Sequence, residues 1–340
     1  MTRCLAKFAL HSPARRILQM SFLSFLIAAS LVSSRAAQTP GREDEIVASL
    51  AGGRVILHVA HDVIIFAAMD KPVEVNSVPP RVMQLDGTHV GILLGASEWQ
   101  VPSDPKPVRL DRDFARIVSE PGQHNPGYDN GEPDLETLGA AFLEKLRPLV
   151  GQLHHKLDFH FDEPLFELVI IGFAPNMYGP EIWQVEYRIE QEQIAARGEY
   201  WQTRILRPRF TQLYPPEGKK SPRELVEVRY PAGNKEPPLA ALIQTGDPRI
   251  SKLRSSDPRF AKVFEAIERG QAQKANAVDA ADFLRAALPL LAGENRFVLG
   301  TMEEQRGFDW LVPPDEPVEK ITDDKSRPPQ APSLRRRPTP

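Results

Sequence analysis

The chain has 340 residues, of which 41% are hydrophobic and 26% charged, and its formal net charge is −3. This length can bury a sizeable core as one large domain or as two smaller ones, so length alone does not set the domain count. The slightly acidic balance argues against a nucleic-acid partner, because proteins that bind nucleic acids usually carry an excess of positive charge.

The amino terminus has the pattern of an export signal. Basic residues precede the run MSFLSFLIAASLV, and small residues follow at Ser34 and Ala36. The run has about thirteen residues, fewer than the ~20 that span a bilayer, and it suits the core of a signal peptide. We therefore expect a signal peptide at 1–36, a periplasmic or extracellular protein, and no stable membrane span after cleavage. An uncleaved short anchor is the alternative.

Removal of 1–36 changes the charge and the redox chemistry of the chain. That segment holds five Lys and Arg residues and no acidic residue, so 37 basic and 45 acidic residues remain, a net charge near −8. Cys4, the one cysteine, leaves with the signal. A mature domain without cysteine relies on its core rather than on disulfides.

Two strand pairs are predicted next. Apolar runs surround His61-Asp62, and segments 82–85 and 88–94 flank Asp86-Gly87. Asp-Gly is favoured in two-residue hairpin turns, because both positions need a positive φ. Both pairs are therefore expected to be antiparallel hairpins.

Four segments are expected to lie outside the regular fold. An appended segment at 37–53 is predicted to contain a short amphipathic helix, Glu43 to Ala51, ended by Gly52-Gly53. Turn residues dominate at 100–133 and 208–256, which are predicted to be insertions, the first with a short helix at 114–118. Residues 313–340 hold eight prolines and many charges, which predicts a disordered tail.

The remaining segments show clear helix or strand periodicity. Trp183, Val185, Tyr187 and Ile189 alternate with polar residues, which places four large side chains on one sheet face. Asp257 and Pro258 can begin a helix that Gly270 ends. The predicted helices are 135–153, 257–270 and 278–292, and the predicted strands are 165–173, 183–189, 200–206, 297–300 and 308–312.

The order of these elements is similar to that of the proteasome-type N-terminal nucleophile hydrolases. VIIFAAMD resembles the family's second strand and the acid after it, and RVMQLDGTHVGILLGA its third and fourth strands. FELVIIGFAPNMYGPEIWQV is similar to the fifth and sixth, and VLGTMEEQRGFDWLV to the closing pair. The resemblance covers roughly 54–312. It implies one α+β domain, a four-layer αββα sandwich with two packed, mainly antiparallel sheets between helical layers, and self-association.

The resemblance also assigns roles to three residues. In the family, a Thr, Ser or Cys at the processed start of the first strand attacks, and its α-amino group, with a pKa near 8, accepts the proton. A lysine on the third strand supplies charge, and the acid after the second strand orients it. By position Asp70 matches that acid, Arg81 the lysine, and Arg54 the nucleophile. Arginine stays charged and cannot shuttle a proton.

Because the nucleophile and the lysine are both replaced, we expect a non-catalytic structural or binding subunit with a remnant pocket of Asp70, Arg81 and Arg54. The rival hypothesis is an active amide or peptide hydrolase in which a second processing event frees Ser49 as nucleophile. Thr39 is the weaker candidate, because it lies far upstream and Pro40 follows it.

Histidines and acids gather at 154–164, HHKLDFHFDEP, but their spacing matches no zinc motif, so we predict neither a metal nor a cofactor. His58, His61 and His89 lie on or near strands. The sequence has no Gly-x-Ser-x-Gly elbow to complete a triad, so they are expected to be ordinary strand and turn residues.

Aromatic residues suggest a third class of function, a periplasmic ligand- or carbohydrate-binding module. Such a module would stack its ligand on an aromatic face. Alternating aromatics in a two-layer sheet are usually core residues, which favours a structural role instead. The residues of this face are Trp183, Tyr187, Tyr200 and Trp201.

Overall fold

The computed structural model separates Met1–Glu45, which lies outside the described residues, from Ile46–Pro340, which contains every element below. The described residues are 47–60, 62–70, 77–85, 89–100, 108–110, 112, 128–129, 132–133, 135–154, 164–174, 179–194, 200–216, 225–230, 236–292 and 296–314.

The larger sheet has eight strands, in the order β14-β11-β10-β6-β1-β4, with β5 and β7 also paired to β6. The β1–β4 pair is parallel, and the other pairs are antiparallel. Its strands are β1 (Val47–Ala51), β4 (Ser77–Val78), β5 (Arg81–Gln84), β6 (His89–Trp99), β7 (Val108–Arg109), β10 (Phe166–Ala174), β11 (Gly179–Tyr187) and β14 (Arg209–Tyr214).

The second sheet has five antiparallel strands in the order β15-β2-β3-β16-β17. They are β2 (Gly53–Val59), β3 (Val63–Asp70), β15 (Val226–Tyr230), β16 (Phe297–Glu303) and β17 (Gly307–Val312). Two separate ribbons pair β12 (Ile189–Gln193) with β13 (Trp201–Ile205), and β8 (Tyr128–Asp129) with β9 (Glu132–Pro133).

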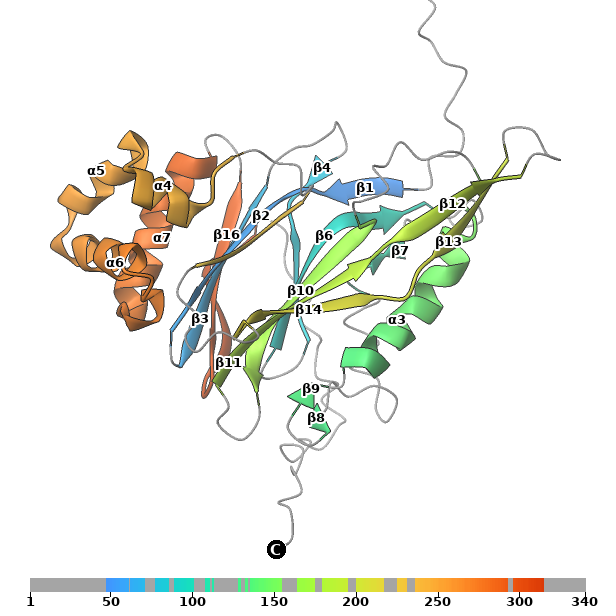
Figure 1. Ribbon diagram of the computed structural model, residues 1–340, viewed down its shortest axis with the longest axis horizontal. Helices are drawn as coiled ribbons and strands as arrows, with labels where there is room; N and C mark the ends of the chain where they lie inside the picture. The colour runs from blue at the N-terminus through green and yellow to red at the C-terminus, as the bar shows by residue number, and fades with distance from the viewer. Residues whose placement is uncertain are drawn as a thin grey trace, which may run out of the picture. The chain divides into compact units, whose positions relative to one another are not determined.

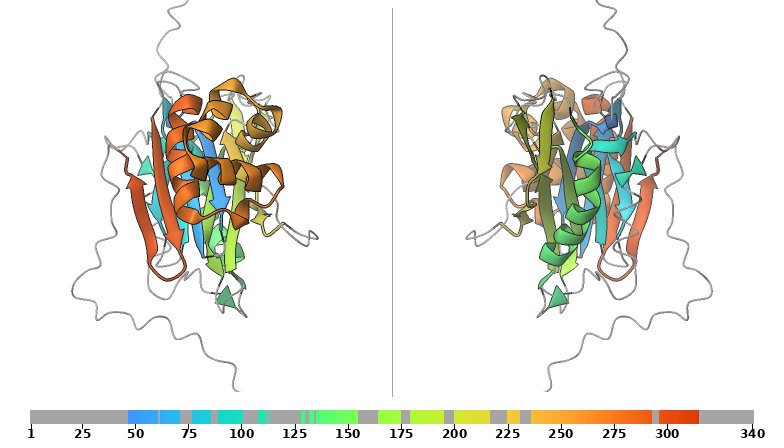
Figure 2. Two further views of the ribbon diagram at one scale, coloured as in Figure 1. Left: turned by 90° about the vertical axis from the view of Figure 1, so that its left-hand side faces the viewer. Right: turned by 90° about the vertical axis from the view of Figure 1, so that its right-hand side faces the viewer.

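The described helices fall into two groups. Figures 1 and 2 show α4, α5, α6 and α7 gathered beside β16, β3 and β2, whereas α3 lies apart, near β12 and β13. Asp257 caps α6 by accepting a hydrogen bond from the backbone N–H of Arg259. The helices are α3 (Leu135–Val150), α4 (Leu239–Thr245), α5 (Pro248–Ser256), α6 (Pro258–Glu268) and α7 (Ala277–Ala292), with a 3-10 turn, η3 (Ala272–Lys274).

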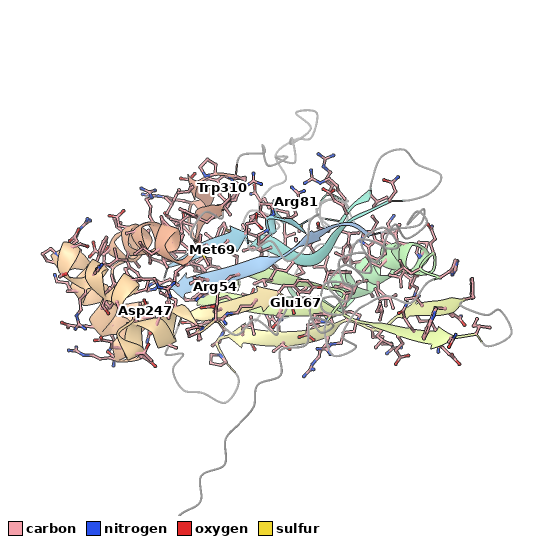
Figure 3. The ribbon with its side chains drawn as sticks, turned by 90° about the horizontal axis from the view of Figure 1, so that it is seen from above. Arg54, Met69, Arg81, Glu167, Asp247 and Trp310 are labelled. Carbon is pink, nitrogen blue, oxygen red and sulfur yellow. The ribbon has the colours of Figure 1, made fainter. Side chains whose placement is uncertain are left out.

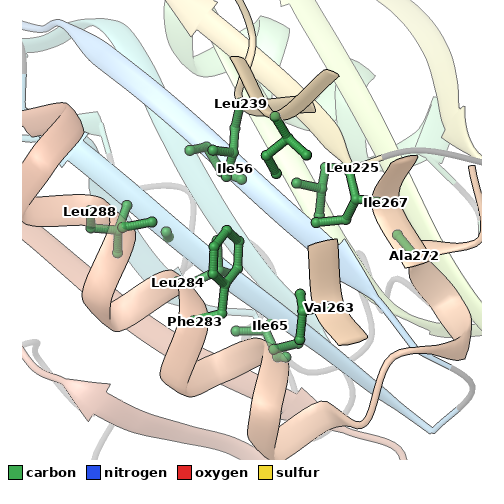
Figure 4. Packing of buried hydrophobic residues seen from close by; sticks show 14 of the residues in the cluster. Ile56, Ile65, Leu225, Leu239, Val263, Ile267, Ala272, Phe283, Leu284 and Leu288 are labelled. Carbon is green, nitrogen blue, oxygen red and sulfur yellow. The ribbon is translucent and has the colours of Figure 1, made fainter. Parts of the chain in front are cut away.

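The central hairpin β2–β3 is buried on both of its faces, which explains its continuous apolar sequence. On one face Val55, Leu57 and Phe66 join a cluster with β6 and β10 of the larger sheet. On the other face Ile56 and Ile65 pack against the helices, as Figure 4 shows. The hairpin is therefore the layer shared by two separate hydrophobic clusters.

A third cluster covers the opposite face of the eight-stranded sheet. Phe142 of α3 meets Phe166 edge-on at 5.8 Å between ring centroids, and Phe166 stacks on Tyr187 at 4.6 Å. The predicted alternation in 183–189 is confirmed, because Val185, Tyr187 and Ile189 all lie in this cluster and Trp183 packs against it.

The predicted four-layer αββα sandwich is wrong. The structure consists mainly of antiparallel sheets and ribbons, and its helices do not form two outer layers. The helices α4–α7 gather on the five-stranded sheet, whereas α3 is the one described helix that packs on the eight-stranded sheet. The ribbon β12–β13 lies beside it, where a second helical layer would have to be. The order of elements along a chain does not determine how many helices cover each sheet, so the resemblance could not fix the layers.

Two local predictions are also wrong. Residues 208–256 are not weakly ordered turns, because they contain β14, β15, α4 and α5. Strand β1 lies where the helix Glu43–Ala51 was predicted. Strand β14, RFTQLY, pairs with β11 and shows no clean alternation. Strand β15, VEVRY, pairs with distant β2, and its alternation of apolar and polar residues is a strand signal that the prediction overlooked.

The other predicted elements that fall on described residues are confirmed. They are the hairpins β2–β3 and β5–β6, helices α3, α6 and α7, and strands β10, β11, β13, β16 and β17. The signal peptide 1–36, the turns at His61 and Asp86-Gly87, the helix at 114–118 and the tail beyond residue 314 lie outside the described residues.

Candidate functional site

Arg54 and Asp70 belong to the same hairpin but to opposite faces of it. In the β2–β3 ladder Arg54 is directly opposite Met69, and Gly53 is opposite Asp70. Residues directly opposite share a face, and neighbours along a strand alternate. Arg54 therefore lies on the helix-facing side with Met69 (Figure 3), and Asp70 lies on the side that faces the larger sheet.

Arg54 is a member of a buried ion cluster. Its Nε lies 2.6 Å from Glu227 Oε1, and its Nη2 donates to Glu227 Oε2 at 3.0 Å. Arg229 Nε donates to Glu227 Oε1 at 2.7 Å. The side chains of Arg54 and Glu227 are only 4% and 6% exposed. We call Arg54, Glu227 and Arg229 the basic–acidic cluster.

The same glutamate holds the first helix of the helical group. The backbone N–H of Leu239, at the start of α4, donates to Glu227 Oε2 at 2.9 Å. Pro238 precedes this helix and provides no side-chain cap. Glu227 thus supplies the acceptor that a capping side chain normally supplies, and it ties α4 to β15 and β2.

Arg81 lies in the other sheet, opposite Leu93 of β6. Its Nη2 donates to Glu98 Oε1 at 2.8 Å, and Arg109 Nε lies 4.0 Å from the same oxygen. Within the described part of the chain no bond joins Arg81 to Asp70. Arg81, at the position that resembles the family's lysine, therefore pairs with Glu98 and not with Asp70.

Asp70 ends β3 in a buried position, with 8% of the residue exposed. Its backbone N–H donates to the carbonyl of Arg296 at 2.8 Å, but its Oδ1 is buried and makes no hydrogen bond to the described residues. Burial raises the pKa of the Asp70 carboxyl above its ordinary value, and the positive charge of Arg296 partly opposes this. A carboxyl destabilised in its charged form is poorly suited to orient a catalytic cation.

Replacing Asp70 with asparagine is expected to raise the free energy of unfolding at pH 7 by about 1 kcal/mol, because a buried, incompletely bonded charge is removed. A raised pKa in the folded state favours folding at low pH, and this contribution is lost as pH rises above about 4, so the gain should shrink in acid. Urea unfolding at pH 7 and pH 3.5 measures both effects. Destabilisation at pH 7 would indicate that the attraction of Arg296 outweighs the cost of burying the Asp70 charge.

Ser49 lies within β1, opposite Glu98 in the irregular ladder that β1 forms with β6. Glu98 is thus the register neighbour of Ser49 and the ion-pair partner of Arg81, and it was not singled out from the sequence. Ser49 belongs to the eight-stranded sheet and Asp70 to the five-stranded one. Thr39 lies outside the described residues.

The four aromatic residues do not form one platform. Tyr187 is fully buried between Phe166 and Phe142. Tyr200 precedes β13 and stacks on His154 at 4.5 Å. Trp183 is half-buried, and its Nε1 donates to Glu181. These side chains therefore have separate structural partners, which does not fit a continuous stacking surface.

Two buried histidines differ in their surroundings. His89 Nε2 lies 3.2 Å from Glu181 Oε1. Both residues are opposite Gly172 of the strand between them, and the glycine leaves room for the two side chains to meet. His58 is 1% exposed, its Nε2 has no hydrogen-bond partner among the described residues, and burial lowers its pKa to about 4. In the sequence, the glycine at position 172 inside an apolar strand is the feature that could have indicated the His89–Glu181 pair.

Of the histidine-rich segment 154–164, only His154 and Pro164 are described. Among the described residues no three His, Cys, Asp or Glu side chains gather as a metal site would require. Likewise, no described helix combines the length and apolar character needed to cross a bilayer.

Comparison of the chain with protein-family models gave no match, and a search of curated proteins gave no significant match.

Proposed function

We propose that the chain is an exported, non-catalytic protein that acts as a structural or binding subunit. One observation carries the proposal: Arg54 and Asp70 lie on opposite faces of one hairpin. Arg54 pairs with Glu227, whereas Asp70 is buried near Arg296. Catalysis by an N-terminal nucleophile needs the attacking group, the cation and the acid within hydrogen-bond reach of one another.

The chemistry of the individual residues supports the same conclusion. Arg54 is a permanent cation engaged by Glu227, so it cannot attack a carbonyl carbon. Arg81 is engaged by Glu98, and its guanidinium cannot exchange a proton at neutral pH. Burial disfavours the charged form of Asp70. The two arginines therefore suit a structural role, and neither can act as nucleophile or proton shuttle.

The proposal predicts that the mature protein does not react with a β-lactone probe that acylates N-terminal hydroxyl nucleophiles. Intact-mass measurement should show a chain that begins at Ala37 or Gln38 and gains no mass. An active N-terminal nucleophile hydrolase serves as the positive control. A chain that begins at Ser49 and carries the probe, with the probe lost in Ser49→Ala, would establish the rival hydrolase.

As a subunit, the protein is also proposed to self-associate. Sedimentation velocity at increasing protein concentration tests this part separately. A larger species that grows with concentration is expected, and a single monomeric species over the whole range would contradict it.

A further inference from the structure

The side of the five-stranded sheet that faces the helices combines apolar packing with ionisable groups. Along β2, alternation places Arg54, Ile56 and His58 on this side. Ile56 and Ile65 pack among apolar side chains of the helices, as Figure 4 shows. We call α4–α7, residues 239–292, the helical cover.

His58 lies under this cover. It is opposite Ile65 of β3, and η3, within the cover, contacts β2. The imidazole is fully buried, and its Nε2 has no hydrogen-bond partner in the part of the chain that the structure describes. A buried imidazolium without an acceptor would lack the hydration it has in water, so His58 is held neutral.

Three carboxylates of the sheet lie on this side among the described residues: Glu227, Glu303 and Asp309. Glu303 of β16 is half-buried and its Oε2 lies 3.6 Å from Arg306 Nε, and Asp309 of β17 is exposed, so Glu227 is the one buried carboxylate of the three.

Glu227 is already shared by Arg54, Arg229 and the N–H of Leu239. In the cover, helix α4 has no ionisable residue, and every buried side chain of the helices is apolar. The ionisable residues of the covering elements are exposed or half-buried: Asp247, Arg249, Lys252, Arg254, Asp257, Arg259, Lys262, Glu265, Glu268, Arg269, Lys274, Asp279, Asp282 and Arg285.

The opposite face of the same hairpin is built differently. The cluster between the two sheets consists of aliphatic and aromatic side chains, and its described ionisable members are Tyr230 and the partly buried Tyr214. Asp70 at its end becomes easier to bury in acid, because protonation removes its charge. Protonation in mild acid therefore adds no charge to the described residues between the sheets.

We propose that protonation of His58 releases the helical cover from the five-stranded sheet in mild acid, while the two sheets stay packed. The released cover admits water to the imidazolium. It also uncovers the apolar side of β2 and β3 that carries Ile56 and Ile65.

The direction and size of the pH effect on the release equilibrium follow from the difference between the two pKa values of His58. The pKa of His58 is about 4 under the cover, and an exposed histidine titrates near 6.5. Neutral His58 therefore gives its full stabilisation of the packed state above pH 6.5, and this stabilisation is lost as pH falls toward 4. The release equilibrium should rise about 30-fold at pH 5 and roughly 150-fold at pH 4, relative to pH 8.

Hydrogen exchange of the full mature chain at pH 8 and pH 5, corrected for intrinsic rates, tests the proposal. Peptides from 239–292 should exchange about 30-fold faster at pH 5, while peptides from β6 and β10 keep their protection. His58→Leu should abolish the difference between the two pH values. His154→Leu, a change at an exposed histidine, should keep it.

Two outcomes would overturn the proposal: equal acceleration in His58→Leu and wild type, or simultaneous loss of protection in the cover, β6 and β10. NMR titration of the His58 ring in the wild-type protein gives an independent check if the leucine variant does not fold. The apparent pKa of the His58 ring is expected to be well below 6, and a value near 6.5 would contradict the proposal.

Discussion

Replacing Glu227 with glutamine is expected to lower the free energy of unfolding by about 3–5 kcal/mol, the usual cost of breaking a buried ion pair. The amide would remove the charged carboxylate that Arg54 and Arg229 share, and the two arginine side chains are only 4% and 14% exposed. The N–H of Leu239 would also lose a charged acceptor at the start of α4.

Urea unfolding of the variant measures this loss, and Glu192→Gln provides a matched control. Glu192 also pairs with an arginine across two strands, Arg204, at 3.6 Å, but both side chains are more than half exposed. The control should lose less than about 1 kcal/mol, because exposed ion pairs contribute little. Equal losses in the two variants would show that Glu227 does not hold the elements together.

Replacing Gly95 with alanine is expected to be the other severe change. Gly95 has a φ of +92°, and an added Cβ would lie 2.6 Å from both Leu165 O and Phe166 Cα. These are backbone atoms of the segment that enters β10, so they cannot move aside as a side chain could. The left-handed conformation costs about 1–2 kcal/mol for a residue with a Cβ, and overpacking adds about 1–3 kcal/mol.

Gly179→Ala separates these two contributions. Gly179 has a similar φ of +88°, but the described atoms leave the space around its Cβ position open to 4 Å. Its replacement should therefore cost only the conformational part, about 1–2 kcal/mol, in the same thermal or urea unfolding measurement. If the two alanine variants lose the same stability, the close approach of the backbone at Gly95 has no energetic role.

The sequence predicted the elements whose signals are local. Helix α6 begins at Asp257 and Pro258, which form a cap that needs no distant partner, and its last residues precede Gly270. The alternation around Val185 and Tyr187 likewise carries its own evidence for a strand with one face in the core. Local patterns of this kind depend on a few adjacent residues, so they can be recognised in the sequence without knowledge of the fold.

The errors concern structure that depends on distant pairing. Strand β15 is stabilised by β2, and Glu227 bonds Arg54 at a separation of 173 residues. The segment VASLA of β1 has no strong strand pattern, and its conformation is set by pairing with β6 and β4. The predicted four-layer sandwich failed for the same reason, because helix layering is decided by packing between remote elements.

The candidate pocket shows the same limit. The interval along the chain places Arg54 and Asp70 at the same end of one hairpin, which made them look like members of one site. Only the register, with Arg54 opposite Met69, reveals that their side chains leave on opposite faces. A difference of one residue in a strand pair therefore decides between a shared pocket and two unrelated positions.

A pair of double-mutant cycles tests most directly whether these residues act separately. Unfolding free energies are measured for Arg54→Met, Glu227→Gln, Asp70→Asn and the two double variants that contain Arg54→Met. The structure predicts a coupling above about 1 kcal/mol between Arg54 and Glu227, and a coupling within about 0.5 kcal/mol of zero between Arg54 and Asp70. Strong coupling of Arg54 to Asp70, with none to Glu227, would contradict the geometry and restore a common pocket.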